Sequence, residues 1–154
     1  MTPAQQSSVE RIAAALAQAG LARLPSRVFA ALLVDDDGRM TSAEVGSALG
    51  VSPAGVSGAV GYLEQLGMIR RERERGSRRD VYVVDDDAWH ETMMRHDQIY
   101  GPIKSSLQYA LSTLGEDAPA HRRLAMTREF LVFIENEFDS LSDKWEARKA
   151  ELGY

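Results

Sequence analysis

Apolar positions near the start of the chain recur every three or four residues, the spacing that places them on one face of an α-helix. Between residues 5 and 19 they are Val9, Ile12, Ala13 and Leu16. A second helix should begin near Pro25, because proline is tolerated in a first helical turn, and should end before the acidic turn at residues 35–38. Its apolar face comprises Val28, Phe29, Leu32 and Leu33.

The next part of the chain predicts two short helices joined by a tight turn. Thr41 and Glu44 have the spacing of a capping box, in which each side chain accepts a hydrogen bond from the other residue's backbone N–H. Gly50 ends the first helix, and Ser52 with Pro53 provides an N-cap and a first-turn proline for the second. The second helix carries a buried stripe of Val56, Val60, Leu63 and Leu66.

Two β-strands are expected at residues 68–74 and 80–84, joined by a basic loop at residues 75–79. The order helix, helix-turn-helix, hairpin predicts a winged helix whose core lies at residues 24–84. The fold class is therefore mainly α (α+β), a winged helix-turn-helix with long N- and C-terminal helices.

The remainder of the chain predicts two long helices. From Trp89 to Leu114 apolar positions alternate by three and four, and Pro102 should kink this helix. After Pro119 a heptad seam follows, made of Leu124, Leu131, Phe138 and Trp145 with Thr127, Ile134 and Leu141. Such a seam requires a partner helix, either within the chain or in a second copy. Because Phe130 and Phe133 widen the apolar face, we favour a subunit interface.

The charge is unevenly distributed along the chain. The net charge of -5 comes from residues 85–154, which carry -6, whereas residues 24–84 are neutral overall. Within that neutral part, residues 70–79 hold six arginines against two glutamates. Such a basic island can face phosphate.

Composition excludes several other classes of protein. The chain has no cysteine, so it forms no disulfide and no thiolate metal site. No apolar run is long enough to span a membrane, and residues 1–11 lack a secretory pattern. We therefore expect a soluble, cytoplasmic protein.

Neither a metal site nor a catalytic site is predicted. Residues 35–44 resemble part of an EF-hand loop, but Leu33 stands where the first oxygen ligand is required. Asp86 and His90 share a helix face, whereas His90 and His96 point apart, which is poor geometry for a metal. The sequence contains no motif of a nucleophile elbow, a phosphate loop or a zinc protease. We predict no enzyme activity and no cofactor.

The helix-turn-helix and the wing supply the candidate DNA contacts. The second helix of the pair carries no Lys or Arg, so its small outward residues would approach the groove closely. Arg78 and Arg79 would enter or flank a minor groove, and Asp80 could orient one of their guanidinium groups. Some arginines of the island could instead pair with acidic residues. The full set of candidates is Thr41, Ser52, Pro53, Ala54, Gly55, Ser57, Gly58, Tyr62, Arg73, Arg75, Ser77, Arg78 and Arg79.

Three segments together resemble the MarR superfamily, and within it the GbsR-like branch. They are residues 41–60, residues 62–71 and residues 76–80, and the acidic 85–87 before Trp89 is similar to that branch in particular. The resemblance implies a cytoplasmic homodimer, usually a repressor, in which an N-terminal helix at 1–23 and a C-terminal region at 85–154 dimerise around a DNA-binding core at 24–84. The bare recognition helix departs from common members.

The resemblance also implies a small-molecule effector bound between the winged domain and the dimerisation helices. Candidate lining residues are Trp89, Met93, His96, Tyr100 and Phe130. The predicted function is sequence-specific DNA binding to a pseudo-palindromic operator, with repression relieved by the effector. Two alternatives remain: a winged-helix module that binds proteins, and a ligand-sensing dimer without DNA function.

Overall fold

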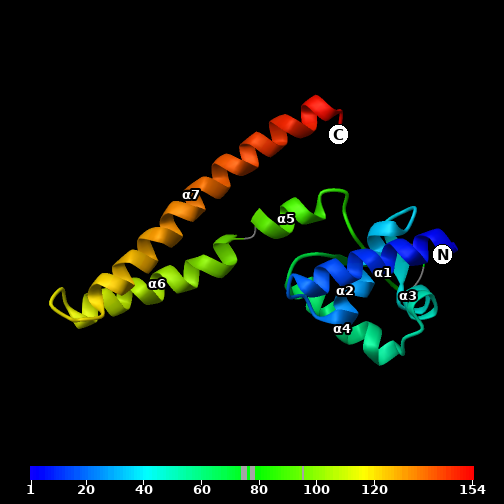
Figure 1. Cartoon of the computed structure of the whole chain (residues 1–154), viewed down its shortest axis with the longest axis horizontal. Coiled ribbons are helices and arrows are strands. Elements are labelled where there is room, and N and C mark those ends of the chain that lie inside the picture. The colour runs from blue at the N-terminus through cyan, green and yellow to red at the C-terminus, as the bar shows by residue number, and fades with distance from the viewer. Residues whose placement is uncertain (74–75, 77–78, 95) are drawn as a thin grey trace. The chain divides into compact units, whose positions relative to one another are not determined.

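The computed structural model describes residues 1–73, 76, 79–94 and 96–154, with only the backbone described at residues 91 and 96–99. The described chain is mostly helical and forms two compact units, Met1–Thr92 and Met93–Tyr154 (Figure 1). The predicted fold class is confirmed by this combination of helices with one small antiparallel sheet.

The first two helices pack against each other in the first unit. Helix α1 (Pro3–Gln18) begins with a capping box between Thr2 and Gln5 that the sequence analysis did not identify. Helix α2 (Arg23–Val34) begins two residues before the expected Pro25, which therefore lies inside the first turn, where its missing N–H costs no helical hydrogen bond.

Helices α3 (Ser42–Leu49) and α4 (Pro53–Gln65) form the predicted helix-turn-helix. Gly50 closes α3 with φ at +66°, a left-handed conformation that glycine adopts without strain. Gly46 allows close packing at the turn, because a Cβ there would lie 3.2 Å from the Val51 carbonyl oxygen. The two helices are thus positioned by local backbone features that the sequence displays.

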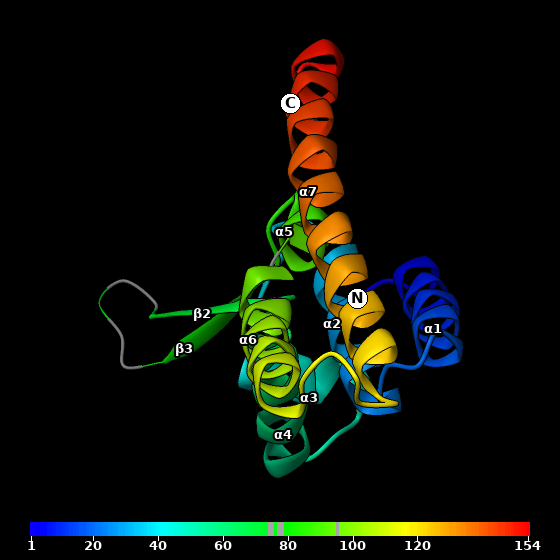
Figure 2. The same ribbon diagram turned by 90° about the vertical axis from the view of Figure 1, so that its left-hand side faces the viewer.

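The sheet has three strands in the order β1-β3-β2. Strands β2 (Arg70–Arg73) and β3 (Asp80–Val83) are the predicted wing, which projects from the helices of the first unit (Figure 2). Strand β1 (Arg39–Thr41) was not predicted; it pairs with β3 so that Met40 lies opposite Tyr82. The wing is therefore anchored to the chain segment that leads directly into α3.

The hydrophobic core lies in the first unit. The largest fully buried apolar side chains come from α1, α2, α3 and α4, and they are Phe29, Leu32, Leu63, Val9, Val28, Val45, Val56 and Val60. Met68, Tyr82 and Val84 join them from the sheet region. Most positions of the three helix faces given above as apolar are buried; Ile12 and Leu16 are half-buried, and Leu33 and Leu66 are exposed.

In the segment expected to form one helix from Trp89, the structure describes two helical stretches on either side of residue 95, which lies outside the described residues. Helix α5 is Ala88–Met94 and helix α6 is His96–Leu114. Pro102 lies inside α6, and the kink expected there stays a prediction. Proline removes one helical hydrogen bond and crowds the preceding turn. Helix α6 nevertheless continues through Pro102, and it packs against α7.

Helix α7 (His121–Leu152) forms an antiparallel hairpin with α6 in the second unit (Figure 1). The predicted row Leu124, Leu131, Phe138 and Trp145 is half-buried. Of the second predicted row, Thr127 and Leu141 are exposed and Ile134 is half-buried. Glu135 instead faces α6, where its carboxylate pairs with the Lys104 ammonium. Part of the seam therefore packs within the chain.

The division at residues 92 and 93 differs from the proposed domain limits. Helix α1 belongs to the first unit, and its Val9 and Ala13 are buried in the core of that unit. The assignment of residues 1–23 and 85–154 to dimerisation stays a prediction.

Candidate nucleic-acid interface

The capping box at the start of α3 adopts the predicted geometry. The Thr41 backbone N–H donates to Glu44 Oε2 at 2.7 Å, and the Glu44 N–H donates to Thr41 Oγ1 at 3.3 Å. The Thr41 backbone hydrogen bond lowers the pKa of Glu44, and the Thr41 hydroxyl and the positive charge of Arg79 act in the same direction. Thr41 therefore caps α3, and the positive charge of Arg79 contributes to the lowered pKa of Glu44.

Helix α4 has one face in the core and one face open. Ser52 Oγ accepts the Gly55 N–H at 3.2 Å and caps the helix, and Pro53 occupies the first turn. The buried face consists of Val56, Ala59, Val60 and Leu63. The exposed positions include the predicted contacts Ser52, Pro53, Ala54, Ser57, Gly58 and Tyr62. Those six residues lie together along the start and outer side of one helix.

Gly55 is the exception among the predicted α4 contacts. It is half-buried, and a Cβ at this position would lie 3.4 Å from Leu24 Cδ2. Gly58 and Gly61, by contrast, would place a Cβ in open space. Gly55 therefore belongs partly to the packing of α4 on α2, whereas the outer surface at Gly58 is smooth.

The arginines of the basic island divide into two kinds. Arg70 forms a fork with Asp85, donating from Nε at 2.8 Å and from Nη2 at 2.7 Å, and these hydrogen bonds lower the pKa of Asp85. Arg71 forms a second fork with Glu64, donating from Nη2 to Oε2 at 2.9 Å. The alternative that some arginines of the island pair with acidic residues is therefore confirmed for Arg70 and Arg71. Arg70 pairs with Asp85 and Glu72, and Arg71 pairs with Glu64.

Of the other predicted wing contacts, the structure describes two. Arg73 and Arg79 are exposed, whereas Arg75, Ser77 and Arg78 lie outside the described residues. Arg73 and Thr41 line a common hollow of about 550 Å³, together with Arg39 of β1. The carboxylate of Asp80, expected to orient Arg78 or Arg79, lies 3.4 Å from Arg71 Nη1.

The predicted effector residues are distributed over both units. Trp89 is in the first unit, half exposed, with its ring centroid 6.4 Å from that of Phe29. Met93, Tyr100 and Phe130 are in the second unit, and the His96 side chain lies outside the described residues. Their grouping into a pocket stays a prediction.

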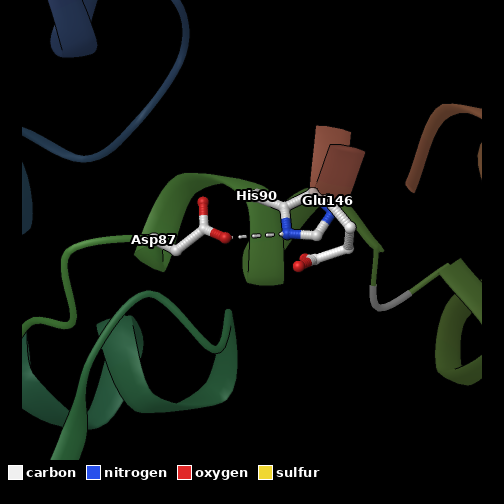
Figure 3. Close-up of side chains that lie close together, drawn as sticks. All are labelled: Asp87, His90 and Glu146. Atoms are coloured by element: carbon white, nitrogen blue, oxygen red, sulfur yellow. Dashed lines mark hydrogen bonds and ion pairs between the residues drawn. The ribbon is translucent and has the colours of Figure 1, made fainter. Parts of the chain in front are cut away.

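His90 contacts a different acid from the one that its spacing suggested. Its Nδ1 lies 3.2 Å from Asp87 Oδ2, within the turn that leads into α5 (Figure 3). Asp86, four residues before His90, was the expected neighbour on the helix face. Both acids precede α5, which begins at Ala88, so the helical spacing of four between Asp86 and His90 does not apply there.

No helix in the described part of the chain is long and apolar enough to cross a membrane. This finding agrees with the hydropathy of the sequence.

Comparisons with known proteins identify the family. The MarR family model matches residues 19–80, and the model for MmpR5-like MarR family transcriptional regulators matches residues 87–148. The chain is 28% identical over 144 residues to HTH-type transcriptional regulator MmpR5 of Mycobacterium tuberculosis, covering 93% of this chain and 87% of that protein. A crystal structure of a transcriptional regulator superposes with a TM-score of 0.83 at 27% identity, over 94% of this chain and 99% of that one. With the helix-turn-helix and wing described above, the chain belongs to the MarR family of winged-helix, DNA-binding transcription regulators.

Proposed function

We propose that this protein is a cytoplasmic homodimeric repressor that binds a pseudo-palindromic operator through α4 and the wing and is released by a small-molecule effector. It acts by binding and carries out no catalysis. The observation that carries the proposal is the open outer face of α4, which lies on a helix-turn-helix whose opposite face is fully buried.

The exposed face of α4 favours a close fit to the major groove. Ala54, Ser57 and Gly58 have short side chains or none, so the helix backbone can approach base edges that longer side chains would keep at a distance. Without Lys or Arg on this helix, bidentate recognition of guanine from α4 is excluded. Recognition would rest on van der Waals fit, on Ser57 and Tyr62, and on DNA shape.

The wing supplies the phosphate contacts in this proposal. Arg70 and Arg71 form forks with Asp85 and Glu64, and we assign the contacts to the exposed Arg73 and Arg79 together with the predicted Arg75 and Arg78. Arg73 is the last residue of β2, and Arg79 directly precedes β3. Their role would be to fix the protein on the DNA backbone.

Dimerisation is supported by the apolar surface of the second unit. Helix α7 buries no side chain, and Phe130 and Phe133 are 58% and 55% exposed. Met126 and Leu141 continue the same exposed row along the helix. Exposed aromatic and aliphatic residues in a row support an interface, and a second copy would supply the second α4 helix that a two-fold site requires.

Three finer parts of the proposal rest on resemblance. Repression and an effector site near Trp89, Met93, His96, Tyr100 and Phe130 are what a MarR-like regulator implies. The GbsR-like branch is proposed from residues 76–80 and 85–87, although the C-terminal half matches the MmpR5-like model.

The test is a selection of bound fragments from the genome, followed by footprinting and light scattering. We expect dimer mass at micromolar concentration and protection of two half-sites about 10 bp apart, one helical turn. Replacing Arg73 and Arg79 with Ala would remove about four phosphate contacts per dimer, so the slope of log affinity against log salt should become shallower by about 3 to 4.

Two results would count against the proposal. A monomer that selects no DNA would favour the protein-binding alternative. An unchanged salt slope in a folded dimer that lacks both arginines would remove the wing from the DNA contacts.

A further inference from the structure

Arg71 joins three elements of the first unit through one side chain. It lies on β2 and donates from Nε and Nη2 to the two carboxylate oxygens of Glu64, at 3.2 and 2.9 Å. Glu64 is in the last turn of α4. On its other side, Arg71 Nη1 lies 3.4 Å from Asp80 of β3. The guanidinium therefore spans from α4 to both strands of the wing.

The ring of Tyr82 also contacts the Arg71 guanidinium. Its guanidinium carbon lies 5.7 Å from the centroid of the Tyr82 ring, in the range of a cation–π contact. Tyr82 is buried, with 5% of its surface exposed, so the ring offers a rigid platform. A planar guanidinium with two parallel hydrogen bonds has one preferred orientation, which a lysine ammonium does not have.

This arrangement contributes little to stability. Arg71 and Glu64 side chains are 40% and 30% exposed, and ion pairs in such positions are worth little to folding because water solvates both partners in the unfolded chain. The chain turns between α4 and β2 through Gly67, whose φ of +72° permits the reversal. The fork connects the end of α4 to the wing in addition to this turn.

We propose that Arg71 is a positioning residue for DNA recognition, which holds the wing at a fixed angle to α4 through the Glu64 carboxylate and the Tyr82 ring. The proposal rests on the proposed placement of α4 in the major groove. If α4 and the wing must contact one duplex at the same time, a fixed angle favours the DNA whose groove shape matches it. Arg71 then determines selectivity without contacting DNA.

A phosphate-binding role for Arg71 would predict the opposite effect of changing Glu64. If Arg71 held a phosphate, Glu64→Gln would free the guanidinium, remove a negative charge near DNA and strengthen binding to every duplex. If Arg71 positions the wing, Glu64→Gln loosens the fork and weakens binding to the preferred duplex despite the more favourable charge. The sign of the Glu64→Gln effect therefore separates the two roles.

The experiment measures the affinity of the full chain for two duplexes. One is the duplex most enriched by the wild-type protein from a random-sequence pool, and the other is a shuffled duplex of the same composition. Variants are Arg71→Lys, which keeps the charge but loses the fork, Glu64→Gln, and the two combined. Arg27→Lys and Glu10→Gln are the matched controls, because Arg27 donates to Glu10 at 2.7 and 3.0 Å between α2 and α1.

We expect each single variant to reduce the affinity ratio of enriched to shuffled duplex about five- to tenfold, and the double variant to reduce it no further, because both changes break one interaction. Affinity for the shuffled duplex should change less than about twofold, and the salt slope should be retained. The controls should leave the ratio unchanged, and thermal unfolding should confirm that all variants fold.

The proposal is overturned if Glu64→Gln tightens binding to both duplexes, or if Arg71→Lys leaves the ratio unchanged. A wild-type protein that enriches no sequence refutes the proposed function itself and this inference with it. Enrichment by the wild type with unaffected variants refutes the inference alone.

Discussion

The two units of the chain bury their apolar residues very differently. In the first unit, helices α1 to α4 all contribute to the core, and its Phe29, Leu32 and Leu63 are at most 1% exposed. In the second unit, none of the described side chains is buried, although α6 and α7 carry many apolar residues. A helix with an apolar face gains stability only by covering that face. The first unit therefore covers much of its apolar surface by itself, whereas the described apolar side chains of the second unit stay half-buried or exposed.

The same difference separates the roles of the units. The described residues among the predicted DNA contacts, from Thr41 to Tyr62 with Arg73 and Arg79, lie in the unit with the core. The exposed row containing Phe130 and Phe133 lies in the unit without one. Recognition requires preorganised geometry, whereas assembly requires apolar surface that is still available.

Separating the two units tests whether each of them folds by itself. We expect residues 1–92 alone to unfold cooperatively, because their core is contained in the fragment. Residues 93–154 alone should be largely unfolded in dilute solution, because none of their described side chains is buried and too little apolar surface is covered to stabilise two helices. Their helix content should rise with protein concentration. Circular dichroism against temperature and concentration measures both. A stable, monomeric 93–154 fragment would show that the hairpin needs no partner.

The next largest effect concerns the exposed row of the second unit. Phe130→Ser combined with Phe133→Ser should weaken the dimer by about 3 to 6 kcal/mol, because aromatic residues at an interface centre carry much of its binding energy. Sedimentation at micromolar concentration should then show monomer with a folded first unit.

Leu33→Ser is the matched control for the aromatic double variant, since Leu33 is an exposed apolar residue of the first unit. It should leave the dimer intact. A dimer that survives loss of both phenylalanines would move the interface to another face.

A smaller effect should distinguish two leucines of the first unit. Leu63→Ala should lower the free energy of unfolding by about 2 to 5 kcal/mol, because it opens a cavity in a fully buried site. Leu66→Ala, at a position 39% exposed, should cost well under about 1 kcal/mol. Denaturant unfolding measures both, and equal costs would contradict the assignment of the core face.

The smallest predicted effect is a pH dependence at the α3 cap. The lowered pKa of Glu44 means that its cap stabilises the fold above the unfolded-state pKa, near 4.5, and that this contribution is lost as pH falls through the folded-state pKa. Glu44→Ala should therefore cost about 0.5 to 1 kcal/mol at neutral pH, a typical value for part of a capping box, and less as the solution is acidified.

Glu116→Ala, in the turn after α6, serves as the control for the capping variant, because no helix cap uses that residue among the described hydrogen bonds. Unfolding curves at neutral and acidic pH compare the two variants. A cost for Glu44→Ala that grows on acidification would contradict the expected sign.

Local features of the sequence predicted the helix-turn-helix and the wing. The Thr41–Glu44 box, Gly50, and the Ser52-Pro53 start of α4 were all predicted, because caps and turns involve residues at most a few positions apart. The outer face of α4 followed from helical periodicity, and the wing strands followed from their flanking turn. MarR family membership, predicted from the same segments, was confirmed by the comparisons.

Only the tertiary structure decided which residues separated in sequence would pair. Strand β1 is three residues long and pairs with Val81, Tyr82 and Val83, about forty positions away, so no local pattern marked it. Arg70 and Arg71 looked like their neighbours in a basic island, and the fold alone brought Asp85 and Glu64 to them. Glu135 turned toward Lys104 for the same reason. Capping and periodicity act over one or two turns of chain and are written in the sequence, whereas charge pairing and strand order depend on where distant segments meet in space.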